Sequence, residues 1–110
     1  MSEKLPQSSS SQSQSTENKF KLPSVLTLQH ARKLASVEDK PIMLDYWTNS
    51  LDKGCLIGVR KSGEKVLAKS EDEYTSPIAK FYKSDVEYII ITENSIYIVS
   101  SEIEVRQISN

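Results

Sequence analysis

Hydrophobic residues recur with the period of an α-helix in KLPSVLTLQHARKLASVEDK, residues 21–40. Ser24 or Thr27 can act as the N-cap, because a side-chain oxygen there accepts from a free backbone N–H of the first turn. Apolar side chains then follow at helical spacing, at Leu28, Ala31, Leu34 and Ala35. Pro41 ends the pattern, since the residue before a proline disfavours helical backbone angles. One helix is therefore predicted between Ser24 and Pro41.

After Pro41 the period changes to two, which indicates a strand over PIMLDYW, residues 41–47. The alternation places Ile42, Leu44 and Tyr46 on one face and Met43, Asp45 and Trp47 on the other. Trp47 is then either covered by the helix as a core residue or exposed. If it is exposed, it is an interface anchor, because large aromatic residues contribute much of the energy of binding.

The second half of the chain predicts further strands. Residues 54–70 indicate a hairpin with a tight turn at Gly63. VEYIIIT, residues 86–92, becomes apolar on both faces, which is typical of a central strand. SIYIVS, residues 95–100, follows after a short turn, and EIEVRQI, residues 102–108, alternates like a strand with one face in solvent.

The connection KSEDEYTSPIAKFYK, residues 69–83, has two interpretations. Pro77 can begin a short helical turn in which Ile78 and Phe81 pack inward and close one end of a barrel. Alternatively, the stretch is a recognition loop on a rigid scaffold, a common place for functional residues. The central residues of that loop are Tyr74, Thr75, Ser76 and Tyr82.

Together these elements predict an α+β fold, with one N-terminal helix packed on a twisted, mostly antiparallel sheet or small open β-barrel of about six strands. Residues 22–110 form this single domain. Residues 1–21 are rich in serine and glutamine and bury too little apolar surface to offset the entropy cost of ordering. A disordered tail is therefore expected there.

Composition narrows the classes of function. The formal net charge is -1, so no long-range field attracts a nucleic acid or an anionic membrane. One cysteine and one histidine supply too few ligands for a zinc site, and no glycine-rich phosphate loop is present. No signal peptide or apolar membrane span is recognised. We expect no metal, no cofactor, no membrane partner and an intracellular, cytoplasmic location.

Enzymatic activity is not expected. A thiol-dependent enzyme would need Cys55 beside His30, but the apolar neighbours of Cys55 indicate a buried thiol. ARKLASVEDKPIMLDYW, residues 31–47, resembles the start of a thioredoxin, with a helix, Lys-Pro and a hydrophobic strand. The following TNSLDKGC, residues 48–55, has a single cysteine where that family has Cys-x-x-Cys.

Binding of single-stranded nucleic acid is the alternative function. Small β-barrels bind single strands through exposed aromatic residues and a basic groove. The candidate residues are Trp47, Lys53, Arg60, Lys61 and Lys65. Acidic residues such as Asp52 and Glu64 are interleaved with them, which argues against a continuous basic groove.

Two phrases resemble small uncharacterised proteins of large double-stranded DNA viruses. They are KSEDEYTSPI, residues 69–78, and TENSIYIVS, residues 92–100. The resemblance implies a virus-encoded accessory or virion-associated protein that acts in the host cytoplasm. It rests on no defined motif and assigns no site residue.

The sequence as a whole predicts a non-enzymatic module for protein–protein interaction or for a structural role in an assembly. Its partner would be another protein or a second copy of the same chain. The residues expected to bind the partner are Trp47, Tyr74, Ser76 and Tyr82.

Overall fold

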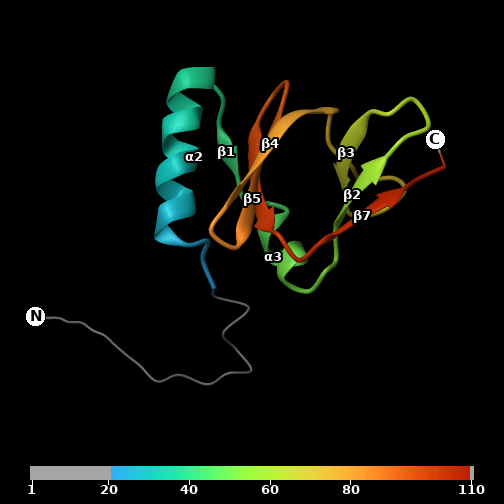
Figure 1. Cartoon of the computed structure of the whole chain (residues 1–110), viewed down its shortest axis with the longest axis horizontal. Helices are drawn as coiled ribbons and strands as arrows, with labels where there is room; N and C mark the ends of the chain where they lie inside the picture. The colour runs from blue at the N-terminus through green and yellow to red at the C-terminus, as the bar shows by residue number, and fades with distance from the viewer. Residues whose placement is uncertain (1–20, 110) are drawn as a thin grey trace, which may run out of the picture.

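The computed structural model describes residues 21–109, in which a helix, a four-stranded sheet and a three-stranded sheet follow one another along the molecule (Figure 1). The predicted α+β class is confirmed. The strands form two mixed sheets, however, and not the expected single sheet or barrel. Of the tail predicted to be disordered, residues 1–20 lie outside the described part of the chain. No helix in the described part is long and apolar enough to cross a membrane.

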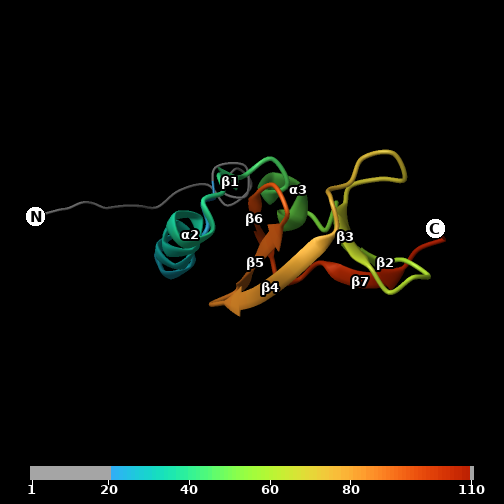
Figure 2. The same cartoon turned by 90° about the horizontal axis from the view of Figure 1, so that it is seen from above.

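The long helix α2, Val25–Glu38, covers one face of the four-stranded sheet (Figure 2). Ser24 is its N-cap, and the Ser24 side chain accepts from the backbone N–H of Thr27. The helix ends at Glu38, and its C-cap Asp39 has a left-handed φ of 56°, which closes the last turn before Pro41 is reached. The prediction for this segment is confirmed.

The four-stranded sheet has the order β1-β6-β5-β4. Its strands are β1, Ile42–Met43, β4, Ile78–Ser84, β5, Glu87–Thr92, and β6, Ile96–Ser100. β1 pairs parallel with β6, and the other pairs are antiparallel. β5 lies inside the sheet between β4 and β6, as its apolar run predicted.

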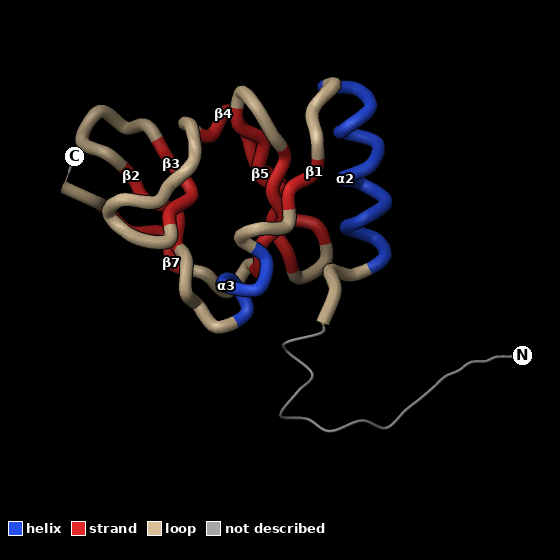
Figure 3. Tube along the Cα trace, turned by 180° about the vertical axis from the view of Figure 1, so that it is seen from behind, coloured by secondary structure: helices blue, strands red, loops and turns tan. Residues whose placement is uncertain are grey.

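The three-stranded sheet has the order β3-β2-β7. Its strands are β2, Leu56–Val59, β3, Lys65–Ala68, and β7, Glu104–Gln107. β2 and β3 form the predicted hairpin, and Gly63 at its turn takes a φ of 95°, which favours glycine. β7 joins the other side of β2 in parallel. Viewed from behind, the chain passes between the two sheets at 52–55, 69–77 and 101–103 (Figure 3).

Two hydrophobic clusters lie on opposite faces of the four-stranded sheet. The alternation of β5 separates them, because Ile90 points toward the three-stranded sheet while Ile89 and Ile91 point toward α2. The cluster between the sheets is formed by Tyr46, Cys55, Ile57, Leu67, Ile90, Val99 and Ile103. The cluster under the helix is formed by Ala31, Trp47, Ile89, Ile91, Ile96 and Ile98.

The strand predicted over residues 41–47 is wrong beyond Met43. The chain turns there into a short helix, α3, Trp47–Leu51. Tyr46 packs between the sheets and Trp47 packs under α2. Successive residues of a helical turn differ by about 100° in direction, so two neighbouring aromatic side chains can enter two different clusters.

The helical turn predicted at residues 77–83 is also wrong. Residues 78–84 form β4, which pairs antiparallel with β5 along its length. The spacing of Ile78 and Phe81 fits one helical turn, but the register of the ladder shifts between Ile78 and Lys80. The shift lets the segment pair with β5 although its apolar residues do not alternate regularly.

Candidate functional site

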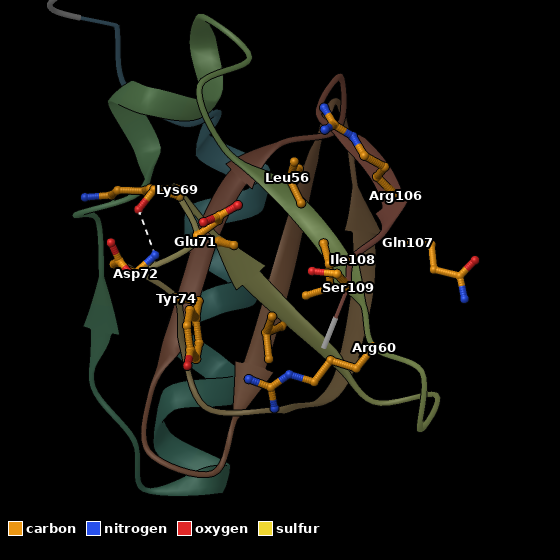
Figure 4. A pocket seen from close by; sticks show the side chains of 13 residues that line it. Leu56, Arg60, Lys69, Glu71, Asp72, Tyr74, Arg106, Gln107, Ile108 and Ser109 are labelled. Atoms are coloured by element: carbon orange, nitrogen blue, oxygen red, sulfur yellow. Dashed lines mark hydrogen bonds between the residues drawn. The ribbon is translucent and has the colours of Figure 1, made fainter.

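A hollow with a volume of about 670 Å³ lies on the outer face of the three-stranded sheet (Figure 4). Leu56, Val66 and Ala68 line it, and the register explains why they share a face. Leu56 is opposite Ala68, whereas the next pair, Ile57 opposite Leu67, points into the core between the sheets. The strand alternation of the β2–β3 hairpin thus produces an apolar floor.

One wall of the hollow is the connection between β3 and β4. The backbone N–H of Lys69 donates to the carbonyl oxygen of Glu73 at 2.8 Å, which closes a tight acidic turn. The next residue, Tyr74, bridges to Ala68. Thr75 is buried, and its Oγ1 accepts from the backbone N–H of Leu67 at 3.1 Å. Backbone and side-chain hydrogen bonds therefore hold Tyr74 at the rim.

The opposite wall comes from the end of the described chain. Ile108 lies over Gly58, where a Cβ added to the glycine would stand 2.9 Å from Ile108 Cδ1. The backbone N–H of Ile108 also donates to the carbonyl oxygen of Val59 at 2.9 Å. A larger residue at Gly58 would therefore force the Ile108 side chain to shift. Arg106 lies on the same wall.

Charges of both signs surround the apolar floor. The guanidinium of Arg60 lies 5.2 Å from the centre of the Tyr74 ring and also pairs with Glu64 at 3.2 Å. A cation over an aromatic face is attracted by the negative charge of the ring face. Arg106 and Lys69 add positive charge, and the acidic turn adds negative charge through Glu71 and Asp72.

The hollow offers apolar and charged groups to a ligand or partner. Within residues 21–109, no group of three or more His, Cys, Asp and Glu side chains is placed to hold a metal ion. The hollow itself is lined by no cysteine or histidine. An apolar floor with a fixed aromatic residue and several charged groups at its rim is typical of a site for a ligand or a partner side chain.

The structure separates the residues predicted to bind a partner. Tyr74 is 46% exposed and faces the hollow, where it meets Arg60 from the alternative set. Tyr82 lies on β4, outside the hollow. Ser76 Oγ accepts from Asn94 Nδ2 at 3.2 Å, beside the turn between β5 and β6.

The prediction of Trp47 as an exposed anchor is wrong. Its side chain is 4% exposed, and its Nε1 donates to the carbonyl oxygen of Lys21 at 2.9 Å. The short helix α3 turns the ring under α2, so it stabilises the core and cannot contact a partner.

The alternative nucleic-acid set is brought together only in part, since Arg60, Lys61 and Lys65 share the β2–β3 hairpin while Lys53 and Trp47 lie elsewhere. Without Trp47, it has no aromatic residue on which a base could stack. Lys53 lies in the turn after α3, with a left-handed φ of 58°, while Lys61 and Lys65 are exposed on the β2–β3 hairpin. Arg60 of the same set is engaged with Tyr74 and Glu64.

The thiol pair considered in the sequence does not form. Cys55 is buried between the two sheets, and burial raises the pKa of its thiol to about 11. His30 lies on α2, where its Nδ1 is 2.9 Å from Ser84 Oγ. The two side chains belong to different layers of the molecule, so His30 is not placed to activate Cys55.

Sequence reasoning missed most residues of the hollow, among them Leu56, Val66, Arg106 and Ile108. Because side chains alternate along the strand, Leu56 points to the outer face when its neighbour Ile57 points inward. The place of Leu56 on the outer face could therefore have been predicted. Arg106 and Ile108 could not, because they reach the hollow only through the parallel pairing of β7 with β2.

Comparison with family models, with curated proteins and with solved structures finds no match for the chain. Any assignment of function therefore depends on the fold and the hollow alone. The resemblance to viral proteins stays a prediction.

Proposed function

We propose that this chain is a non-enzymatic protein-interaction module, and that the hollow takes up an anchor side chain from a partner protein. The observation that supports this most directly is the exposed Tyr74 ring, which lines the hollow beside its apolar floor and has the Arg60 guanidinium over it. Tyrosine and arginine are enriched among the residues that dominate binding energy. A ring already held in place loses little conformational entropy when a partner binds.

The hollow suits one large apolar side chain with its flanking backbone. Its volume falls within the range of about 300–1,000 Å³ that is common for ligand sites, although it is open to solvent. The floor would contact the apolar group. The charged residues at the rim, Arg60, Arg106, Glu71 and Asp72, would bind polar groups beside it. We therefore expect the partner segment to carry an aromatic or aliphatic residue between charged ones.

Selection from a displayed library of random peptides, followed by fluorescence anisotropy with the selected peptides, tests this function. Tyr74→Ala is expected to weaken binding by roughly tenfold or more, the effect of removing an anchor residue. Tyr82→Ala is a matched control, because Tyr82 is a similarly exposed tyrosine on another strand. Equal binding by the wild-type chain and Tyr74→Ala would show that the hollow is not the site.

Labelled single-stranded DNA in the same assay tests the alternative function. Binding through phosphate contacts falls steeply as salt is raised. Two results together would replace the proposed function with nucleic-acid binding. The first is that the selection yields no binding peptide. The second is salt-sensitive DNA binding that is lost when Lys61 and Lys65 are substituted.

A further inference from the structure

The outer edge of β4 is a second surface, separate from the hollow. β4 has seven residues, ends the order of the four-stranded sheet and pairs with β5 alone. Figure 2 shows it as a long strand along the side of the molecule. In an antiparallel ladder every second residue directs its backbone N–H and C=O away from the neighbouring strand. The described chain therefore leaves a row of backbone donors and acceptors on this edge.

Exposed aromatic side chains stand on both faces of β4. Phe81 is 38% exposed and Tyr82 is 43% exposed. Phe81 is opposite Ile90 and shares the face that looks toward the three-stranded sheet, where it packs edge-to-face on Tyr88 at 5.4 Å. Tyr82 is on the α2 face, opposite Ile89. A strand added to this edge would thus meet apolar surface above and below.

The flank of α2 above this edge carries two exposed apolar side chains, Leu26 and Val37. Leu26, His30, Lys33 and Val37 follow one another at intervals of four, three and four residues, so they form one stripe along the helix. The contact of His30 with Ser84 shows that this stripe is on the β4 side. Leu26 is 49% exposed and Val37 is 79% exposed. Burying such side chains against another protein is favourable.

We propose that a second copy of this chain docks on the β4 edge, so that the two β4 strands pair antiparallel and the sheet continues through both copies. The two-fold axis of such a pair is perpendicular to the sheet. Both α2 helices then lie on the same side of the joined sheet, with their Val37 flanks toward each other. A bare strand from another protein would cover the edge of β4 but would leave Leu26 and Val37 in water.

Charge selects the position of the axis. Lysine on an edge strand normally opposes pairing, and an axis at Lys80 or Lys83 would place two like charges opposite each other. An axis at Phe81 or Tyr82 instead places an aromatic pair at the centre and keeps the lysines apart. Lys80 is in addition paired with Glu38 of its own copy at 3.1 Å. In these two registers, the β4 edge of one copy can therefore pair with the β4 edge of a second copy without opposing like charges.

Sedimentation velocity of the full chain over a range of concentrations tests this inference. We expect a dimer to form by about 100 µM and Val37→Glu to raise its dissociation constant roughly tenfold, because a charge must then be buried at the interface. Val25→Glu is the matched control, since Val25 is 71% exposed on another side of the same helix. A thermal melt first confirms that both variants fold. A wild-type chain that stays monomeric, or equal effects of the two substitutions, would overturn the proposal.

Cross-linking then locates the axis in a Cys55→Ala background. Phe81→Cys or Tyr82→Cys should form a disulfide between copies under mild oxidation. A residue on the two-fold axis is opposite the same residue of the second copy, with about 5 Å between the Cα atoms. Val105→Cys, a more exposed site on β7, should not. Cross-linking of Val105→Cys alone would place the interface on the other sheet and overturn the inference. Peptide binding by the hollow is tested separately and does not depend on this result.

Discussion

Two titratable side chains, Tyr46 and Cys55, are buried between the two sheets at 4% exposure each. Burial is the main reason that the pKa of Tyr46 is raised to about 12, and the negative charge of Glu73 adds to it. Burial also raises the pKa of Cys55 to about 11. Lys69, whose Nζ lies 4.6 Å from the centre of the Tyr46 ring, covers this part of the core.

Stability should consequently fall at alkaline pH. The unperturbed pKa values are 9.0 for the thiol and 10.0 for the phenol, so the folded chain holds both protons more tightly than the unfolded chain. The associated stability is fully present below about pH 9 and is lost as pH rises through 11 and 12. Each group should contribute on the order of 2 kcal/mol.

Urea unfolding at pH 8 and pH 10.5, followed by circular dichroism, measures this loss. Tyr46→Phe and Cys55→Ala each remove one titrating proton and should flatten the dependence on pH. The same slope in all three proteins would mean that neither group is buried as described.

At the scale of elements, α2 is attached to its sheet by a buried carboxylate. Glu87 is 2% exposed and lies beneath the N-terminus of the helix. Its Oε2 accepts from the backbone N–H of Ser24 at 3.2 Å, and its Oε1 accepts from Ser24 Oγ at 2.9 Å. Thr27 Oγ1 lies 2.6 Å from the same Oε1. A negative charge at this end is further stabilised by the helix dipole.

Glu87→Gln should therefore lower the free energy of unfolding by about 1–3 kcal/mol, because the neutral amide turns a donor toward donors and loses the charge-assisted bonds. Chemical denaturation of the wild-type and variant chains measures the effect. Glu93→Gln makes the same chemical change at an exposed turn and should leave the stability nearly unchanged. Equal losses in the two variants would contradict this role of Glu87.

Sequence patterns predicted the elements whose own periodicity is strong. α2 has a clear cap and helical spacing, and β5 has an uninterrupted apolar run. α3 and β4 were predicted wrongly, because their local patterns fit more than one structure. The alternation at 41–47 also fits a strand that stops at Met43, and residues 78–84 join a sheet only because β5 offers a partner edge.

At the scale of the molecule, the two sheets share one core and are connected at three places in the chain, 52–55, 69–77 and 101–103. Leu67, from the three-stranded sheet, is fully buried in this core. Trp47 packs on the other face of the four-stranded sheet, under α2. The fluorescence of Trp47 can thus report whether damage to one sheet affects the other.

Leu67→Ala should destabilise the whole chain by about 2–5 kcal/mol, the usual range for a large apolar side chain removed from a core. The unfolding midpoint from Trp47 fluorescence should shift together with that from circular dichroism, as in a two-state transition. Val105→Ala, at an exposed position of β7, should change little. An unchanged Trp47 midpoint in Leu67→Ala would show that the sheets unfold independently.

The sequence by itself determined the α+β class, the position of α2 and the β2–β3 hairpin. These depend on local spacing, caps and turn residues, which act over a few positions. Only the tertiary structure decided that Trp47 is buried, that Arg60 lies over the Tyr74 ring, and that β4 ends the described four-stranded sheet. Those features depend on which strands pair and on where the chain crosses between sheets, and many residues far apart in the sequence determine that outcome together.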